Sequence, residues 1–387
     1  MKNTAGLLMQ LLRAELELLP LDGECRGQLD AATVAELYAL SSGHDLAHML
    51  ASVLMREGLV PEGELGEQLK KKKLLAAFRY SQISRELASI CEVLEDAAIP
   101  YIPLKGSVIR RLYREGWLRT SSDIDILVRT EDVERARLAV IEELDYTQTN
   151  ENGHEIGLYS PTGVHFELHK ALVEKESYAA FDEVLQHVWE HATVAEGTEY
   201  RYELSDAMFY YYHVAHMAKH YMNGGCGIRS FMDMYVLMTD DEKLLSARRE
   251  LLAAGGLANF EKHALELTRV WFAGAEHSDT TRFMQRFILS GGTYGSVDNG
   301  VALKKSKKGG FGYLLSRIWL PYDRLKYQYP YLNGRKYLIL WYEIRRWWRL
   351  LLHKDKLKRS VNELRTSANV GGDEQQAISE HLKELGL

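Results

Sequence analysis

The stretch that decides the fold is YIPLKGSVIRRLYREGWLRTSSDIDILV at residues 101–128, completed by VHFELH at residues 164–169. Tyr101–Leu104 is a short apolar run, and Asp123–Val128 alternates before a β-branched, apolar end. Both patterns are typical of strands. VIRRLY at 108–113 lies between them and predicts a helix. This order indicates a small α/β sheet.

The segment that follows extends the sheet. Thr130 precedes an amphipathic stretch with acidic residues in its first turn, so it is predicted as the N-cap of a helix. Two further strands are expected at 154–159 and 164–169, and the turn Ser-Pro-Thr-Gly at 160–163 predicts that they form a hairpin. The sheet should therefore have mixed strand directions.

The sharpest chemical signal is Asp123-Ile124-Asp125. Residues i and i+2 of a strand point to the same face, so the two carboxylates should project together and repel each other. Hard divalent cations such as Mg²⁺ or Mn²⁺ resolve that repulsion. If VHFELH is a neighbouring strand, Glu167 joins them, and three carboxylates can hold the two metals used for in-line phosphoryl transfer.

Two other interpretations of these strands stay open. Asp123 and Asp125 could lie on a solvent-facing strand, although Asp is a poor strand residue. The period of VHFELH places His165, Glu167 and His169 on one face, which allows a zinc site. One strand does not readily supply three ligands to a tetrahedral ion, so we favour the carboxylate interpretation.

Lys105-Gly106-Ser107 precedes the acidic strand by one predicted helix. Glycine lets the backbone approach a phosphate, and Ser107 offers a hydroxyl together with the free N–H groups of a helix start. Lys105 and Arg110 lie nearby in sequence, and Arg119 precedes the strand. The five residues 105, 106, 107, 110 and 119 are therefore candidate phosphate ligands.

These motifs together resemble the nucleotidyltransferases of the DNA polymerase β superfamily, and more closely the bacterial group called uncharacterised nucleotidyltransferases. The resemblance rests on PLKGSVIRRLY, RTSSDIDILV and VHFELH within residues 100–170. It implies that Gly106 and Ser107 hold the triphosphate and that Asp123 and Asp125 bind both metals. Glu167 would complete the site and help to deprotonate the acceptor.

Two features depart from the superfamily pattern. Fifteen residues separate Ser107 from Asp123, slightly more than the usual spacing, and the loop 115–122 must absorb the excess. The third acidic residue is Glu167, where Asp is commoner.

The wider likeness predicts an α+β fold, in which a small mixed β-sheet nucleotidyltransferase core is flanked by N-terminal and C-terminal helical lobes. The expected domains are an N-terminal helical lobe at 1–97, the core at 98–175, a helical substrate lobe at 176–300 and a basic, aromatic C-terminal helical segment at 301–387. Within these, we expect a helix at 206–221, two helices in 242–290 and a mobile, glycine-rich loop at 291–312.

Four further residues are candidate substrate contacts: His169, His216, Lys219 and Arg229. His216 shares a helix face with His213 and His220, and that face could bind metal, line the cleft or pack against Tyr210 and Tyr221. Packing or cleft lining is favoured. Arg229 could contact a substrate phosphate, but its i, i+4 spacing to Asp233 favours an ion pair on one helix.

The charge distribution bears on possible partners. Residues 302–365 hold 17 Lys and Arg against 4 Asp and Glu, whereas residues 1–301 hold 30 against 46. The basic segment could dock on the acidic body, which we favour, or make peripheral membrane contact through residues 313–359. The acidic overall charge, −6, argues against a partner that is long nucleic acid.

Composition excludes several protein classes. With 46% hydrophobic and 26% charged residues, the chain is neither disordered nor a disulfide scaffold. Its three cysteines lie far apart, which excludes a cysteine zinc ribbon and fits a reducing cytoplasm. No secretory signal or transmembrane helix is expected, so a cytoplasmic location is predicted.

The sequence therefore predicts a metal-dependent enzyme that uses Mg²⁺ or Mn²⁺. It would transfer a nucleoside monophosphate from an NTP to a hydroxyl or phosphate of a small-molecule acceptor and release pyrophosphate. Two alternatives are nucleotidylation of a protein or peptide, and a non-catalytic nucleotide-binding protein. Retention of all three acidic residues disfavours the last.

Overall fold

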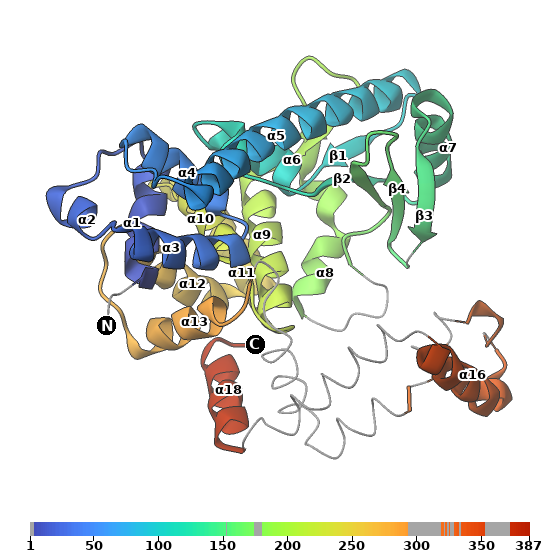
Figure 1. The fold of residues 1–387 in the computed structure, drawn as a ribbon. Helices are drawn as coiled ribbons and strands as arrows, with labels where there is room; N and C mark the ends of the chain where they lie inside the picture. Colours follow the sequence, from blue (N-terminus) through green and yellow to red (C-terminus); the bar gives the residue numbers. More distant parts are fainter. Residues whose placement is uncertain are drawn as a thin grey trace. The chain divides into compact units, whose positions relative to one another are not determined.

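The computed structural model describes residues 4–151, 153–173, 180–292 and 372–387, and between them 319–320, 322, 325, 329–332 and 334–352. It confirms the α+β class, with one five-stranded mixed sheet and helices toward both ends of the chain (Figure 1). Two compact units are present, Met1–Ala218 with Gly227–Gln285 and Lys219–Cys226 with Arg286–Leu387. Most of the predicted loop at 291–312 lies outside the described residues.

The larger unit begins with a helical lobe. Its helices are α1 (Thr4–Leu16), α2 (Gly23–Gly27), α3 (Ala31–Gly43), α4 (Ala47–Arg56) and the first part of α5 (Glu64–Asp96). Asp22 and Asp30 cap α2 and α3, because their side chains accept backbone N–H groups of the first turn. α4 is the centre of the lobe, since its apolar residues from Met49 to Leu54 are fully buried.

The sheet follows α5. Its spatial order is β1 (Tyr101–Pro103), β2 (Asp123–Val128), β5 (His165–His169), β4 (Glu155–Tyr159) and β3 (Thr147–Glu151). β2 and β5 run parallel, and the other neighbouring pairs are antiparallel. The central pair therefore joins the acidic strand directly to VHFELH, as the sequence interpretation required.

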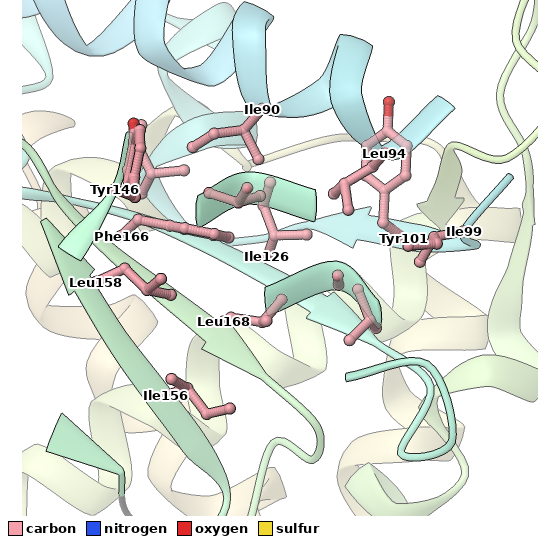
Figure 2. Close-up of a cluster of buried hydrophobic side chains, with 14 of the residues drawn as sticks. Ile90, Leu94, Ile99, Tyr101, Ile126, Tyr146, Ile156, Leu158, Phe166 and Leu168 are labelled. Atoms are coloured by element: carbon pink, nitrogen blue, oxygen red, sulfur yellow. The ribbon is translucent and has the colours of Figure 1, made fainter. Parts of the chain in front are cut away.

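One face of this sheet is a hydrophobic core. Alternate residues of β2 and β5, such as Ile126 and Phe166, point toward α5, which contributes Ile90 and Leu94 (Figure 2). α7 (Val133–Leu144) covers the same cluster with Ala136 and Val140. Because strand residues alternate between faces, the intervening positions, including both aspartates, project to the opposite face.

The remaining elements of the larger unit lie between or after these strands along the chain. They are α6 (Gly106–Ile109), η1 (Arg110–Leu112), η2 (Gly116–Leu118), α8 (Ala180–Gln186), η3 (Val188–His191), β6 (Ala192–Val194), β7 (Tyr202–Leu204), α9 (Asp206–Tyr221), α10 (Ile228–Val236), α11 (Glu242–Ala254), α12 (Ala258–Phe272) and α13 (Asp279–Leu289), of which the ends of α9 and α13 belong to the smaller unit.

Four expectations about these elements were wrong. Residues 242–290 hold three helices rather than two, interrupted near Gly255 and Gly274. The helix predicted at 108–113 is a turn of α-helix from Gly106 followed by a 3₁₀ turn. Thr130 is not an N-cap, because α7 begins at Val133 and the Thr130 hydroxyl donates to the carbonyl of Lys170. No strand was expected where β3 lies.

The smaller unit contains η4 (Pro330–Leu332), η5 (Lys336–Leu338), α16 (Ile339–Leu352) and α18 (Gly372–Glu384). α16 is amphipathic: Tyr342 joins a small buried cluster with Leu325, whereas Trp341 and Trp348 are each 65% exposed. Arg346 pairs with Glu343 of the same helix at 2.7 Å. Membrane contact through residues 313–359 stays a prediction, and part of that range lies outside the described residues. Among the described helices, none has the length and apolarity needed to span a bilayer.

Candidate functional site

The polar face of the sheet gathers the predicted acidic residues. In the register of the parallel pair, Asp125 lies opposite Glu167 and Asp123 lies opposite His165, while Glu155 of β4 lies opposite His169. Donor atoms of Asp125, Glu167 and His169 all lie within 4.8 Å of one another. Glu167 is therefore on the same face as the aspartates.

Asp125 is the centre of this cluster. It is 3% exposed, and its Oδ1 accepts hydrogen bonds from Lys105 Nζ at 2.6 Å and His169 Nε2 at 2.9 Å. Burial alone would raise the pKa of Asp125, but the charge of Lys105 and the hydrogen bond from His169 outweigh it and hold the pKa well below its usual range. Asp125 is thus a permanent negative charge in the site.

His169 joins both carboxylates of the central pair. Its Nε2 also lies 3.5 Å from Glu167 Oε2. Burial lowers the pKa of His169, but the hydrogen bonds to Asp125 and Glu167 outweigh this and raise the pKa above its ordinary value. The sequence named His169 as a substrate contact, and the structure places it beside the proposed metal ligands.

Asp123 occupies the outer end of the same face. Burial raises its pKa, and the negative charges of Asp125 and Glu167 raise it further against the opposing charge of Lys105. Lys105 and Arg229 offset part of this repulsion. Carboxylate oxygens gathered on one face are donors that Mg²⁺ or Mn²⁺ prefers, so these residues fit such an ion.

The Gly-Ser turn lies at one end of β2. The Leu104 N–H donates to the carbonyl of Asp125 at 3.0 Å, which ties the turn to the acidic strand. Lys105 has φ 44° and ψ −121°, a conformation that costs a residue with a Cβ about 1–3 kcal/mol. Gly106 packs closely, because an added Cβ would lie 3.2 Å from that of Ser121. The strained turn directs the ammonium of Lys105 onto Asp125.

Ser107 is the notable residue of the turn. It is 2% exposed, and its hydroxyl has no hydrogen-bond partner within the part of the chain that the structure describes. Buried hydroxyls are normally satisfied, so an unsatisfied one marks a position for a missing polar group. The N–H groups of Ser107 and Val108 are not free, however, because they donate to the carbonyls of Leu104 and Lys105.

The two predicted arginines have structural partners. Arg110 is buried and donates to the carbonyl of Gly106 and to Ser121 Oγ, each at 2.5 Å. Burial and the charge of Arg119 lower the pKa of Arg110 to about 10. Arg119 forms a bidentate ion pair with Asp233 of α10, with Nε and Nη2 each 2.7 Å from a carboxylate oxygen. Their assignment as phosphate ligands stays a prediction.

The same geometry corrects the expected pair of Arg229 with Asp233. Asp233 is taken by Arg119 and by the hydroxyl of Tyr113, whereas Arg229 donates to the carbonyl of Thr120 at 3.0 Å. Arg229 therefore braces the segment that leads into β2.

The histidine face of α9 serves packing in part. His213 Nε2 donates to the carbonyl of Ser230, and burial lowers the pKa of His213. His216 is half-buried, with its ring 6.3 Å from that of Tyr212. Lys219 is exposed and belongs to the smaller unit.

Sequence reasoning missed Tyr212 altogether. This residue of α9 is buried, and burial is the main cause of its raised pKa. Lys105 lies close enough to oppose that rise, and Asp125, Glu167 and Asp123 close enough to add to it. α9 therefore covers part of the polar face. Its aromatic-rich sequence was visible, but only the fold shows which tyrosine faces the carboxylates.

A family model described as "Uncharacterised nucleotidyltransferase" matches residues 30–273. The chain belongs to this family. The matched range holds the Gly-Ser turn, all three acidic residues and Tyr212, and it ends before the basic segment. No curated protein and no solved structure matches the chain. Membership in this family supports a transferase that acts on nucleotides. It does not identify the acceptor.

Proposed function

We propose that this nucleotidyltransferase transfers a nucleoside monophosphate from an NTP to a hydroxyl or phosphate oxygen of a small-molecule acceptor. The acceptor oxygen attacks the α-phosphorus and forms a new P–O bond. The bond from the α-phosphorus to the oxygen bridging to the β-phosphate breaks, and its electron pair leaves with pyrophosphate. Where the acceptor is a hydroxyl, its proton passes to a carboxylate of the site.

One observation carries this proposal. Three carboxylates, at positions 123, 125 and 167, lie on one face of a parallel strand pair, next to a turn whose Ser107 hydroxyl is buried without a partner. The solvent-facing alternative for the acidic strand has no support, because Asp125 is 3% exposed. Carboxylates gathered this closely repel one another, which favours a cation ligand over a purely structural role.

Asp123, Asp125 and Glu167 would hold Mg²⁺ or Mn²⁺. When bound, such an ion supplies a Lewis acid that neutralises the triphosphate and lowers the pKa of the acceptor hydroxyl. Asp125 stays ionised because of Lys105 and His169, so it serves as a ligand and not as a proton acceptor. Glu167 is 21% exposed and is the better placed base for the acceptor proton.

Ser107 supplies the phosphate contact that the turn offers. Its hydroxyl can donate to a phosphate oxygen without giving up a bond within the protein. The ammonium of Lys105 already pairs with Asp125. It can therefore neutralise only a phosphate that binds beside the carboxylates.

Calorimetry with a non-hydrolysable NTP and Mg²⁺ tests the proposal. Asp125→Asn and Glu167→Gln should each weaken Mg²⁺-dependent binding by at least about tenfold, or about 1.4 kcal/mol. Glu142→Gln is the matched control, because this exposed carboxylate lies on α7, which covers the other face of the sheet. Equal Mg²⁺-dependent binding by wild type and both site variants would contradict the proposal.

A transfer assay then defines the acceptor. With NTP labelled at the α-phosphate, the wild type should transfer the label and release pyrophosphate only when an acceptor is present. Asp125→Asn should do neither. Label that appears in polypeptide instead of small molecules would favour protein nucleotidylation over the proposed acceptor class.

A further inference from the structure

We infer that His154, Glu155 and His169 form a second metal site, suited to Zn²⁺ or another borderline divalent transition metal. This site is separate from the carboxylates that would hold Mg²⁺. One donor atom from each of the three residues lies within 4.8 Å of the others. Two imidazoles and one carboxylate are the donors that Zn²⁺ prefers, whereas Mg²⁺ prefers oxygen alone.

The backbone holds these residues together. Glu155 and His169 are register partners on the antiparallel strands β4 and β5, so their side chains share a face. His154 directly precedes β4, and its carbonyl accepts the N–H of Lys170 at 2.9 Å. The donors are thus fixed at one end of a paired strand and not on a long loop.

The distances suit a tetrahedral ion. Ligands about 2.0–2.1 Å from a tetrahedral metal lie about 3.3 Å apart. His154 Nε2 lies 3.4 Å from Glu155 Oε2, and His169 Nδ1 lies 3.8 Å from the same oxygen. Small side-chain movements would bring all three donors to coordination distance. The fourth position remains for water or another ligand.

His169 provides the independent observation. Its Nε2 faces Asp125 Oδ1, which as a carboxylate oxygen only accepts, so the proton belongs on Nε2. Nδ1 then carries a lone pair in the neutral ring. This nitrogen is buried, finds no hydrogen-bond partner among the described residues, and faces a carboxylate oxygen of Glu155. A metal ion between them removes that repulsion in the neutral ring, as a proton on Nδ1 does in the charged one.

The arrangement is the usual one for a metal-binding histidine. Such residues commonly donate the second ring N–H to a carboxylate, which fixes the tautomer and orients the ring. Here that carboxylate is Asp125. A metal on Nδ1 would therefore hold the Nε2 proton against Asp125, and one imidazole would connect the two sites.

Cobalt(II) is the probe for this site, because Co²⁺ in a tetrahedral site absorbs visible light. The full-length, chelator-treated protein is titrated with Co²⁺ at mildly alkaline pH, in millimolar Mg²⁺ that occupies the oxygen ligands. The wild type should bind one Co²⁺ per chain with visible absorption. His154→Ala and Glu155→Gln should weaken this binding by more than about 100-fold, because even the loss of a residue that only supports a ligand costs about 10–100-fold.

Two variants on the same sheet face are controls. His165→Ala removes a histidine of β5 that lies outside the three-residue cluster, and Glu167→Gln removes a carboxylate of the other cluster. Both should keep Co²⁺ binding. Circular dichroism checks that each variant is folded.

The inference is overturned if folded wild type gives no visible Co²⁺ absorption, if His154→Ala and Glu155→Gln bind as wild type does, or if His165→Ala loses binding. The last result would instead favour a zinc site formed within β5. No nucleotide is used, so the result is independent of the proposed transfer activity.

Discussion

The buried ion pair of Arg119 and Asp233 allows a test of whether Arg119 has a structural role or binds phosphate. Asp233 is 2% exposed and receives two hydrogen bonds of 2.7 Å from the guanidinium and one of 2.7 Å from Tyr113. Burial would raise the pKa of Asp233, but the charge of Arg119 outweighs it and lowers the pKa. The carboxylate therefore stays charged in a closed interior.

Arg119→Met removes one partner and leaves that charge buried. Such a change costs about 3–5 kcal/mol. With an unfolding entropy of about 2.1 cal/mol/K per residue over the larger compact unit, the midpoint of thermal unfolding should fall by roughly 5–9 °C. In the double variant Arg119→Met/Asp233→Asn no charge is stranded, and the amide oxygen still accepts from Tyr113. The double variant should therefore regain more than half of the lost stability.

Thermal unfolding followed by circular dichroism measures the stability, and calorimetry with a non-hydrolysable NTP measures binding by each folded variant. The structural interpretation predicts that the double variant binds the NTP as wild type does. If Arg119→Met unfolds at the wild-type temperature, the ion pair does not hold this region together. If the stable double variant loses NTP affinity, Arg119 is a phosphate ligand, as its position before the acidic strand predicted.

Two further predictions concern the helical lobe. Burial lowers the pKa of His44 to about 4, and both ring nitrogens lack a partner among the described residues. An unfolded histidine titrates near 6.5, so the contribution of neutral, buried His44 to the free energy of unfolding is complete above pH 6.5. It falls by about 3 kcal/mol as the pH drops to 4. Denaturant titrations across that range should show that His44→Leu loses this His44-dependent fall in stability. In α5, a Cβ on Gly66 would lie 2.0 Å from the carbonyl oxygen of Pro61, so Gly66→Ala should lower the free energy of unfolding by about 1–3 kcal/mol. A Cβ on Gly27 would meet nothing within 4 Å, so Gly27→Ala should be nearly neutral in the same denaturant titration.

Local sequence patterns predicted the central strands well. Asp123–Val128 was placed to the residue, because a β-branched apolar run between polar ends has few other solutions. β3 was missed for the opposite reason. Its five residues, TQTNE, are all exposed, so this edge strand has no alternation of apolar and polar residues that could predict it.

Pairings between distant residues could not be read locally. The i, i+4 rule paired Arg229 with Asp233, but the fold brings Arg119 to that carboxylate from 114 residues away. The position of Glu167 beside Asp125 depends on β2 and β5 being parallel neighbours, and the sequence could give that pairing only as a condition. The contact of His169 with Asp125, and the position of Tyr212, needed the fold itself.

α5 has a consequence for how this enzyme can be dissected. Its 33 residues span roughly 50 Å, and its buried side chains serve two neighbours in turn. Leu69 is buried in the part that packs on α4, whereas Ile90 and Leu94 cover the sheet. A fragment starting at residue 98 would expose the apolar side of β2 and β5 to water, and it should aggregate unless the whole of α5 is supplied with it.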